Sequence, residues 1–108
     1  MVDYSLRLDL VFGSLSDPTR RDIFKRVSLK EQTVSDVAKH YKMSLAGISK
    51  HLKILERAKL IQKRQHGRQQ FIKATPATLK SVQDYIAQYE QLWNKRFDDL
   101  ESYLKKEG

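Results

Sequence analysis

The chain lacks cysteine altogether, and this absence excludes several kinds of chemistry in its 108 residues. No disulfide framework, thiolate metal site or cysteine nucleophile is available. No apolar run approaches the roughly 18 residues that a membrane span needs. Residues 1–4 lack the basic-then-apolar pattern of a signal peptide. We therefore expect a single domain, residues 1–108, in a reducing cytoplasm, with no membrane partner.

Catalytic and metal-binding motifs are also missing from the sequence. There is no phosphate-cradling glycine loop, no G-x-S-x-G and no H-E-x-x-H. His40, His51 and His66 fall on three different predicted elements without a ligand spacing such as i, i+4. The acidic cluster within residues 98–101 is most simply a solvated helix face. We expect neither an enzyme nor a bound metal or cofactor.

Negative charge is nearly absent from one third of the chain. Between Lys42 and Lys73 there are nine lysines and arginines, and Glu56 is the only acidic residue. This window carries the whole net charge of +8, while the rest of the chain is balanced. A clustered basic patch is the electrostatic footprint of a polyanionic partner. A membrane surface would attract the same charge, but no long helix in the window carries the bulky aromatic face of an interfacial anchor.

Residues 44–58, in the middle of this window, predict one helix with two different faces. Ser44 is a suitable N-cap, and apolar residues then recur at steps of three and four. The apolar face, which we expect to be buried, contains Leu45, Ile48, Leu52 and Leu55. The opposite face, small at its start and basic further along, contains Ala46, Ser49, Lys50, Lys53 and Arg57. Such a face suits a DNA major groove, where small residues approach base edges and cations reach phosphates. The alternative is an ordinary helix with a solvated lysine face.

Shorter helices are predicted before this one, at residues 3–13, 17–28 and 34–41. The second begins with an aspartate–proline pair, and Thr33 caps the third. Because only residues 42–43 separate the third helix from the basic one, the two together predict a helix-turn-helix.

Two features of these helices have more than one interpretation. We expect Arg20 and Arg21 to pair with local acids such as Asp17 or Asp22, and contact with phosphate is the alternative. Gly47 lies inside the basic helix, where glycine costs on the order of 1 kcal/mol relative to alanine. Either a close backbone approach to DNA compensates for this cost, or the packing tolerates it.

A basic hairpin is predicted directly after the basic helix. Residues 60–65 and 68–73 predict two strands, joined by a two-residue turn at His66 and Gly67. A recognition helix followed by such a hairpin is the winged variant of the helix-turn-helix. The hairpin would bring Arg68 to a minor groove, where arginine suits the negative potential, and His66 to a phosphate.

A long final helix begins at Thr75 and Pro76 and is expected to run to about residue 105. Its apolar seam consists of Leu79, Val82, Ile86, Tyr89, Trp93, Phe97, Leu100 and Leu104. At 1.5 Å per residue this seam spans about 40 Å, too long for the core of one small domain to cover. We expect a second copy to cover it, most simply by two-fold symmetry. A small-ligand pocket lined by Tyr85, Tyr89 and Trp93 is the alternative.

With these segments assembled, the sequence resembles the ArsR family of winged-helix transcriptional regulators. The matching segments are residues 12–21, 34–38, 44–60 and the Gly67–Arg68 part of the wing. The resemblance implies a mainly α winged helix-turn-helix with about five helices and a two-stranded β-hairpin. It also implies a prokaryotic, dimeric DNA-binding repressor.

The same resemblance implies that the first and last helices, residues 1–13 and 76–106, form the dimer interface. The interface residues would be Leu6 and Leu10 together with the apolar seam of the last helix. Metal-sensing members carry paired cysteines on the helix before the turn, or Asp, His or Glu ligands on the last helix. Here the first stretch reads Thr33-Val34-Ser35-Asp36, and the last helix has no histidine. The chain is therefore similar to the branch that does not sense metals.

The expected DNA-binding residues lie on the basic helix, beside it and on the wing. They are Thr33, Ser44, Ala46, Gly47, Ser49, Lys50, Lys53, Arg57, His66 and Arg68. The expected partners are double-stranded DNA, with a near-palindromic operator, and a second copy of the chain. Two alternative functions remain. One is a winged-helix protein-interaction module, and the other is a small-ligand-responsive regulator without autonomous operator binding.

Overall fold

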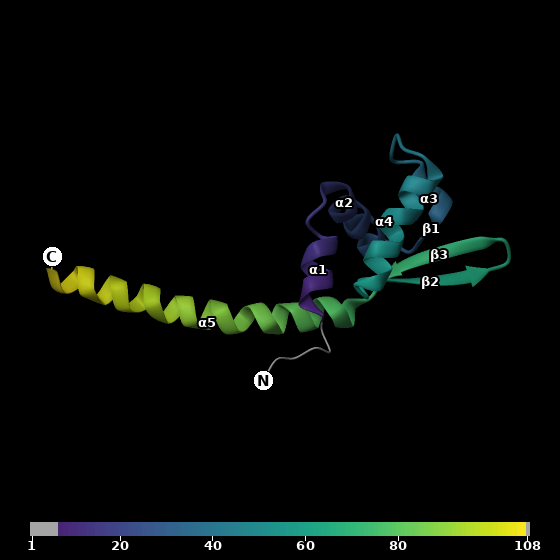
Figure 1. The fold of residues 1–108 in the computed structure, drawn as a ribbon. Helices are drawn as coiled ribbons and strands as arrows, with labels where there is room; N and C mark the ends of the chain where they lie inside the picture. Colours follow the sequence, from purple (N-terminus) through teal and green to yellow (C-terminus); the bar gives the residue numbers. More distant parts are fainter. Residues whose placement is uncertain (1–6, 108) are drawn as a thin grey trace.

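Short helices and a small sheet form one end of the molecule, and one long helix extends away from them (Figure 1). The computed structural model describes residues 7–107. The elements in chain order are α1 (Leu8–Ser14), α2 (Pro18–Leu29), β1 (Gln32–Thr33), α3 (Val34–Ala38), α4 (Leu45–Arg57), β2 (Ile61–His66), β3 (Gln69–Ala74) and α5 (Pro76–Glu107). This arrangement confirms the predicted fold class, a mainly helical winged helix-turn-helix.

α1 packs one side against the helix-turn-helix. Val11 is completely buried in the core, whereas its neighbour Phe12 is about half exposed. Leu10 is half-buried and packs against the core. Leu6, which was predicted in the dimer interface, lies outside the described residues. The core-facing side of α1 is therefore defined by Val11.

Local capping sets the starts of α2 and α3, as the sequence predicts. The Asp17 carboxylate accepts a hydrogen bond from the Arg20 backbone N–H at 3.0 Å, and this bond lowers the pKa of Asp17. The Thr33 hydroxyl accepts from the Asp36 N–H at 3.1 Å, and the Asp36 carboxylate accepts from the Thr33 N–H in return. This reciprocal pair is a capping box, which satisfies two otherwise free donors at a helix start.

α3 is shorter than the helix predicted at residues 34–41, because its last turn tightens. The N–H of His40 bonds to the Val37 carbonyl and that of Tyr41 to the Ala38 carbonyl, three residues back in each case. Three-residue spacing of this kind is common where α-helices end. The connection to α4 consequently runs over residues 39–44 instead of the predicted 42–43.

The predicted hairpin is present, and a third strand joins it. The strand order is β1-β3-β2, and Gln32 of β1 pairs antiparallel with Ile72 of β3. No strand is predicted at this place, since a two-residue strand is too short to show a period in sequence. The hairpin turn is also one residue later than predicted. His66 pairs with Gln69, so that Gly67 is the first turn residue, with φ +61°.

The core lies where α1, α2, α3, α4 and the sheet meet. Its fully or nearly fully buried apolar residues are Val11, Ile23, Val27, Val37, Ile48, Leu52, Leu55, Ala58, Leu60, Ile61, Ile72 and Val82. The prediction that Leu45 belongs to this core is wrong, because its side chain is 61% exposed. Leu45 is the first residue of α4, and the buried face of this helix begins one turn later, at Ile48.

The end of α4 directs the chain into the wing. Lys59 has a left-handed backbone conformation, with φ 61°. Its N–H bonds to the Glu56 carbonyl at 2.9 Å, and the N–H of Leu60 bonds to the Leu55 carbonyl at 3.1 Å. This pair of bonds is a Schellman motif, which also brings the apolar residues Leu55 and Leu60 together. Lysine takes the position that glycine usually occupies in this motif.

The start of α5 differs from the predicted cap. The Thr75 hydroxyl is buried and has no hydrogen-bond partner among residues 7–107, so it does not cap the helix. Instead, the Thr78 hydroxyl donates to the Lys59 carbonyl and ties the first turn of α5 to the end of α4. Pro76 is nevertheless the first helical residue, as predicted.

α5 leaves most of its apolar seam uncovered. The helix has 32 residues, which corresponds to about 48 Å at 1.5 Å per residue. It passes α1 and then continues alone (Figure 1). Val82 is 7% exposed, while the seam residues from Ile86 to Leu104 are 45–59% exposed. Within residues 7–107, no helix is long and apolar enough to cross a membrane.

Candidate nucleic-acid interface

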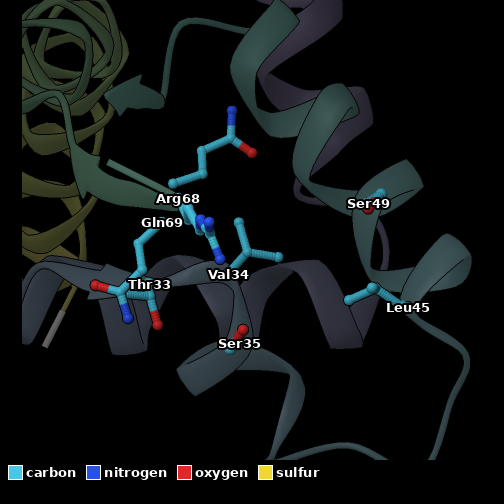
Figure 2. Close-up of a pocket in the computed structure, with 8 residues that line it drawn as sticks. Thr33, Val34, Ser35, Leu45, Ser49, Arg68 and Gln69 are labelled. Atoms are coloured by element: carbon cyan, nitrogen blue, oxygen red, sulfur yellow. The ribbon is translucent and has the colours of Figure 1, made fainter. Parts of the chain in front are cut away.

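The start of α4, the start of α3 and the wing surround one cavity of about 300 Å³. Figure 2 shows Ser49 on α4, Thr33 and Ser35 at the start of α3, and Arg68 at the wing turn around this space. Three predicted DNA-binding residues, Thr33, Ser49 and Arg68, are thus brought to one place although they are far apart in sequence. The recognition helix and the wing form a single surface.

The N-terminus of α4 is held by its predicted cap. The Ser44 hydroxyl accepts a hydrogen bond from the Gly47 N–H at 3.0 Å. A Cβ atom added at Gly47 would lie 3.3 Å from that hydroxyl and 3.7 Å from Sδ of Met43. Such a contact is tight, and the cap would have to shift to relieve it. Glycine at this position therefore leaves room for the Ser44 cap, an explanation that the sequence alone did not suggest.

Two cations of the basic window, residues 42–73, are neutralised within the chain. Nζ of Lys63 lies 3.4 Å from Oε1 of Glu56, and the Lys63 side chain is only 14% exposed. Nη2 of Arg64 lies 3.1 Å from Oε1 of Glu31. The seven other cations of the window are exposed and form no ion pair in the described part of the chain: Lys42, Lys50, Lys53, Arg57, Lys59, Arg68 and Lys73. The positive charge that is available to a partner therefore lies mainly on α4, its flanks and the wing.

The other predicted site residues differ in how accessible their polar groups are. Ala46, Lys50, Lys53 and Arg57 are exposed along α4, while Ser49 and Gly47 are half-buried. Exposed at the end of β2, His66 packs edge-on to Phe71, with ring centroids 6.4 Å apart. Thr33 is 7% exposed, and its hydroxyl is used in the capping box.

Sequence reasoning missed five residues that line the same cavity: Val34, Ser35, Leu45, Gln69 and Gln70. Leu45 was assigned to the core, and Gln69 and Gln70 were treated only as polar wing positions, yet all three face this space. For Leu45 the available signal was its place directly after the Ser44 cap, one turn before the other apolar residues of the helix. For the two glutamines, only the fold shows that they line the cavity, because β3 and α4 approach each other there.

Arg20 and Arg21 do not pair with the predicted acids. Nε of Arg20 donates to the Ser14 carbonyl at 2.6 Å, and Nη1 of Arg21 donates to the Leu15 carbonyl at 2.8 Å. Their preferred partners are thus backbone carbonyls left free at the end of α1. Asp22 instead bonds to Arg26 and Tyr41.

Asp22 accepts hydrogen bonds from Tyr41 and Arg26, the latter at 2.9 Å. These bonds hold the pKa of Asp22 below its usual range, and the bond from Tyr41 has the larger effect. The network joins α2 to the chain that leads into α4. No group of three or more His, Asp or Glu side chains placed to hold a metal ion occurs among the described residues.

A helix-turn-helix whose second helix runs directly into a β-hairpin is the winged class of DNA-binding folds. The helix-turn-helix domain family matches residues 15–64 of the chain. The transcriptional repressor SdpR of Bacillus subtilis (strain 168) is 38% identical over 90 residues, which are 83% of this chain and 97% of SdpR. The crystal structure of the ArsR family transcriptional regulator RHA00566 superposes with a TM-score of 0.79 and 32% identity, over 87% of this chain and 97% of that one.

The chain belongs to the ArsR family, and it is a DNA-binding transcriptional regulator. The family predicted from the sequence is thereby confirmed. A homodimeric winged helix-turn-helix DNA-binding domain from Mycobacterium bovis has the same fold, with a TM-score of 0.63 at 21% identity, over 78% of this chain and 81% of that one.

Proposed function

We propose that the protein is a homodimeric, metal-independent repressor that binds a near-palindromic operator in the cytoplasm. The observation that carries this proposal is the convergence of the α4 N-terminus and the wing on one surface. Seven exposed cations on α4, its flanks and the wing have no acidic partner in the described chain. This surface combines groups that suit base edges with groups that suit phosphates.

In this proposal, α4 enters the major groove with its N-terminal end. Ser44, Ala46, Gly47, Ser49 and Lys50 face base edges and the nearest phosphates, because small side chains there allow the backbone to come close. Lys53 and Arg57, about one and two turns further along, contact phosphates. Thr33 supports the site by capping α3, since its hydroxyl is already used.

The wing adds contacts outside the major groove. Arg68 sits in the hairpin turn and has no acidic partner among residues 7–107, so its guanidinium is available for a minor groove. His66, exposed at the end of β2, contacts a phosphate. Arg64 is held by Glu31 and takes no part.

The exposed seam of α5 supports a dimer. Seven of the eight seam residues are about half exposed, and a second copy covering them would bury a continuous stripe. We propose that α1 and residues 76–106 form this interface. The homodimeric Mycobacterium bovis domain and the repressor SdpR support the proposed assembly and action. Bound at a promoter, such a dimer would exclude polymerase.

The test is binding to the DNA upstream of the protein's own gene, measured by fluorescence anisotropy against shuffled DNA of equal composition. We expect binding at least about 1,000-fold tighter than to shuffled DNA, at a site with half-site centres about 34–36 Å apart. If the natural fragment fails, selection from a random duplex library replaces it. No preference in either experiment would contradict operator binding and favour the protein-interaction module.

A further inference from the structure

The position of Leu45 is unusual for an apolar residue. It is the first residue of the recognition helix, and its side chain is 61% exposed. Figure 2 shows it extending from α4 into the space between that helix and Val34 of α3. Since Ile48, Leu52 and Leu55 supply the buried face of α4, the exposed Leu45 is not needed to close the core.

The surroundings of Leu45 place an apolar group among hydrogen-bonding groups. The cavity of about 300 Å³ is lined by the apolar residues Leu45 and Val34 and by the polar residues Ser49, Gln69 and Gln70, among others. Arg68 adds a positive charge at the wing side of the same cavity. This composition fits a partner surface that has one small apolar group surrounded by polar atoms and phosphates.

We propose that Leu45 is a specificity-determining residue that recognises the C5-methyl group of a thymine in the major groove. The proposal rests on the proposed operator binding and specifies one base of the operator. The N-terminal residues of a recognition helix are those that reach base edges in this class of fold. The thymine methyl is the only apolar group that base pairs present in the major groove, and apolar side chains recognise it by contact. Ser49, one turn further along the same side of the helix, is placed to contact the polar edge of a neighbouring base.

The expected effect follows from the size of a methyl group. Burying one CH₂-sized group is worth about 0.8 kcal/mol, which is about a four-fold change in affinity for each half-site. A dimer on a symmetric operator makes the contact twice. Removing both methyl groups should therefore weaken binding about fifteen-fold, provided that Leu45 is present.

The experiment uses operator duplexes, selected with the wild-type protein, in which deoxyuridine replaces one symmetric pair of thymines at a time. Deoxyuridine lacks only the C5-methyl group. For the wild-type protein, we expect this replacement to weaken binding at one thymine pair. For Leu45→Ala, the same replacement should leave the affinity almost unchanged, as in a double-mutant cycle. Leu45→Met, which keeps an apolar side chain, should retain most of the methyl dependence.

The matched control is Leu29→Ala, a leucine at the end of α2 that is 79% exposed and does not line the cavity. This variant should keep the full methyl dependence. Two results would overturn the inference while operator binding itself persists. In one, deoxyuridine weakens wild-type binding at no thymine pair. In the other, it weakens the binding of Leu45→Ala as much as that of the wild type. If selection yields no preferred duplex, the proposed function fails first and this inference fails with it.

Discussion

Nη1 of Arg20 on α2 lies 3.3 Å from Nδ1 of His51 on the recognition helix. A guanidinium can only donate, so this contact is a hydrogen bond when His51 is neutral and carries its proton on Nε2. The same guanidinium donates to the Ser14 carbonyl at 2.6 Å and to the Gly13 carbonyl at 3.2 Å. One side chain thereby connects the end of α1, the start of α2 and the middle of α4. Arg20 thus holds α4 against α1 and α2.

We predict that Arg20→Ala lowers the free energy of unfolding by about 2 kcal/mol, because hydrogen bonds from a charged donor are lost and partly buried acceptors remain. Arg21→Ala is the matched control, since it removes the same charge but only one exposed hydrogen bond to the Leu15 carbonyl. Urea denaturation followed by circular dichroism measures both. Equal stabilities of the two variants would contradict the proposed role of Arg20.

A second prediction concerns Tyr41. Burial, together with the hydrogen bond to Asp22, raises the pKa of Tyr41 from 10.0 to about 12. The folded state therefore favours the neutral phenol. The contribution of the neutral Tyr41 phenol to the free energy of unfolding is complete below pH 10 and is lost as the pH rises through about 12.

Tyr41→Phe should lower the free energy of unfolding by about 1 kcal/mol at pH 7, where the phenol donates to Asp22. The difference between wild type and variant should shrink between pH 10 and 12. Urea midpoints of both proteins, measured at each pH, isolate Tyr41 from the lysines that titrate in the same range. A difference that stays constant across this interval would show that the hydroxyl has no such role.

A third prediction concerns the dimer. Trp93→Ala and Leu100→Ala should each weaken self-association, because large-to-small changes in a packed interface cost about 2–5 kcal/mol. Both residues are 53% exposed in the single chain. Leu29→Ala, an exposed leucine at the end of α2 and outside the α5 seam, is the control and should leave the dimer intact. Sedimentation at micromolar concentration is the measurement, and a monomeric wild type would refute the interface.

A fourth prediction is that DNA binding does not depend on metal. The chain has no cysteine, and all three histidines precede α5. Affinity for the operator should be the same with a chelator, with stoichiometric zinc and with neither. A reproducible large change on adding one equivalent of zinc would establish a metal-sensing function that the sequence does not indicate.

The sequence predicts well those features that depend on neighbouring residues. The Asp17–Pro18 start of α2, the Thr33 cap and the Ser44 cap are local hydrogen-bonding patterns, and all three are present. The period of the apolar residues likewise located α4 and the long α5. These features need no knowledge of the rest of the fold.

Features that depend on distant residues could not be predicted in this way. β1 exists because Gln32 and Thr33 meet β3, which follows almost 40 residues later in the chain. Leu45 satisfies the helical period of the apolar face, but it lies one turn before the buried residues of α4 and is exposed. Arg20 finds its partners at the end of α1 and on α4 because tertiary packing brings them together.

The most direct test of the central claim, DNA recognition by α4 and the wing, is the salt dependence of operator affinity. Each phosphate contact contributes about −0.9 to the slope of log affinity against log salt concentration. Arg68→Ala should reduce the slope by about two units for a dimer, and Lys53→Ala should do the same. Lys50→Ala should also lower affinity for the operator more than for random DNA.

Arg64→Ala is the control in this measurement, because it removes the same charge from the same hairpin although Arg64 is paired with Glu31. Its slope should match that of the wild type. Unchanged affinity and an unchanged slope for both Lys50→Ala and Arg68→Ala would contradict the proposed docking, even if the protein binds DNA through another surface.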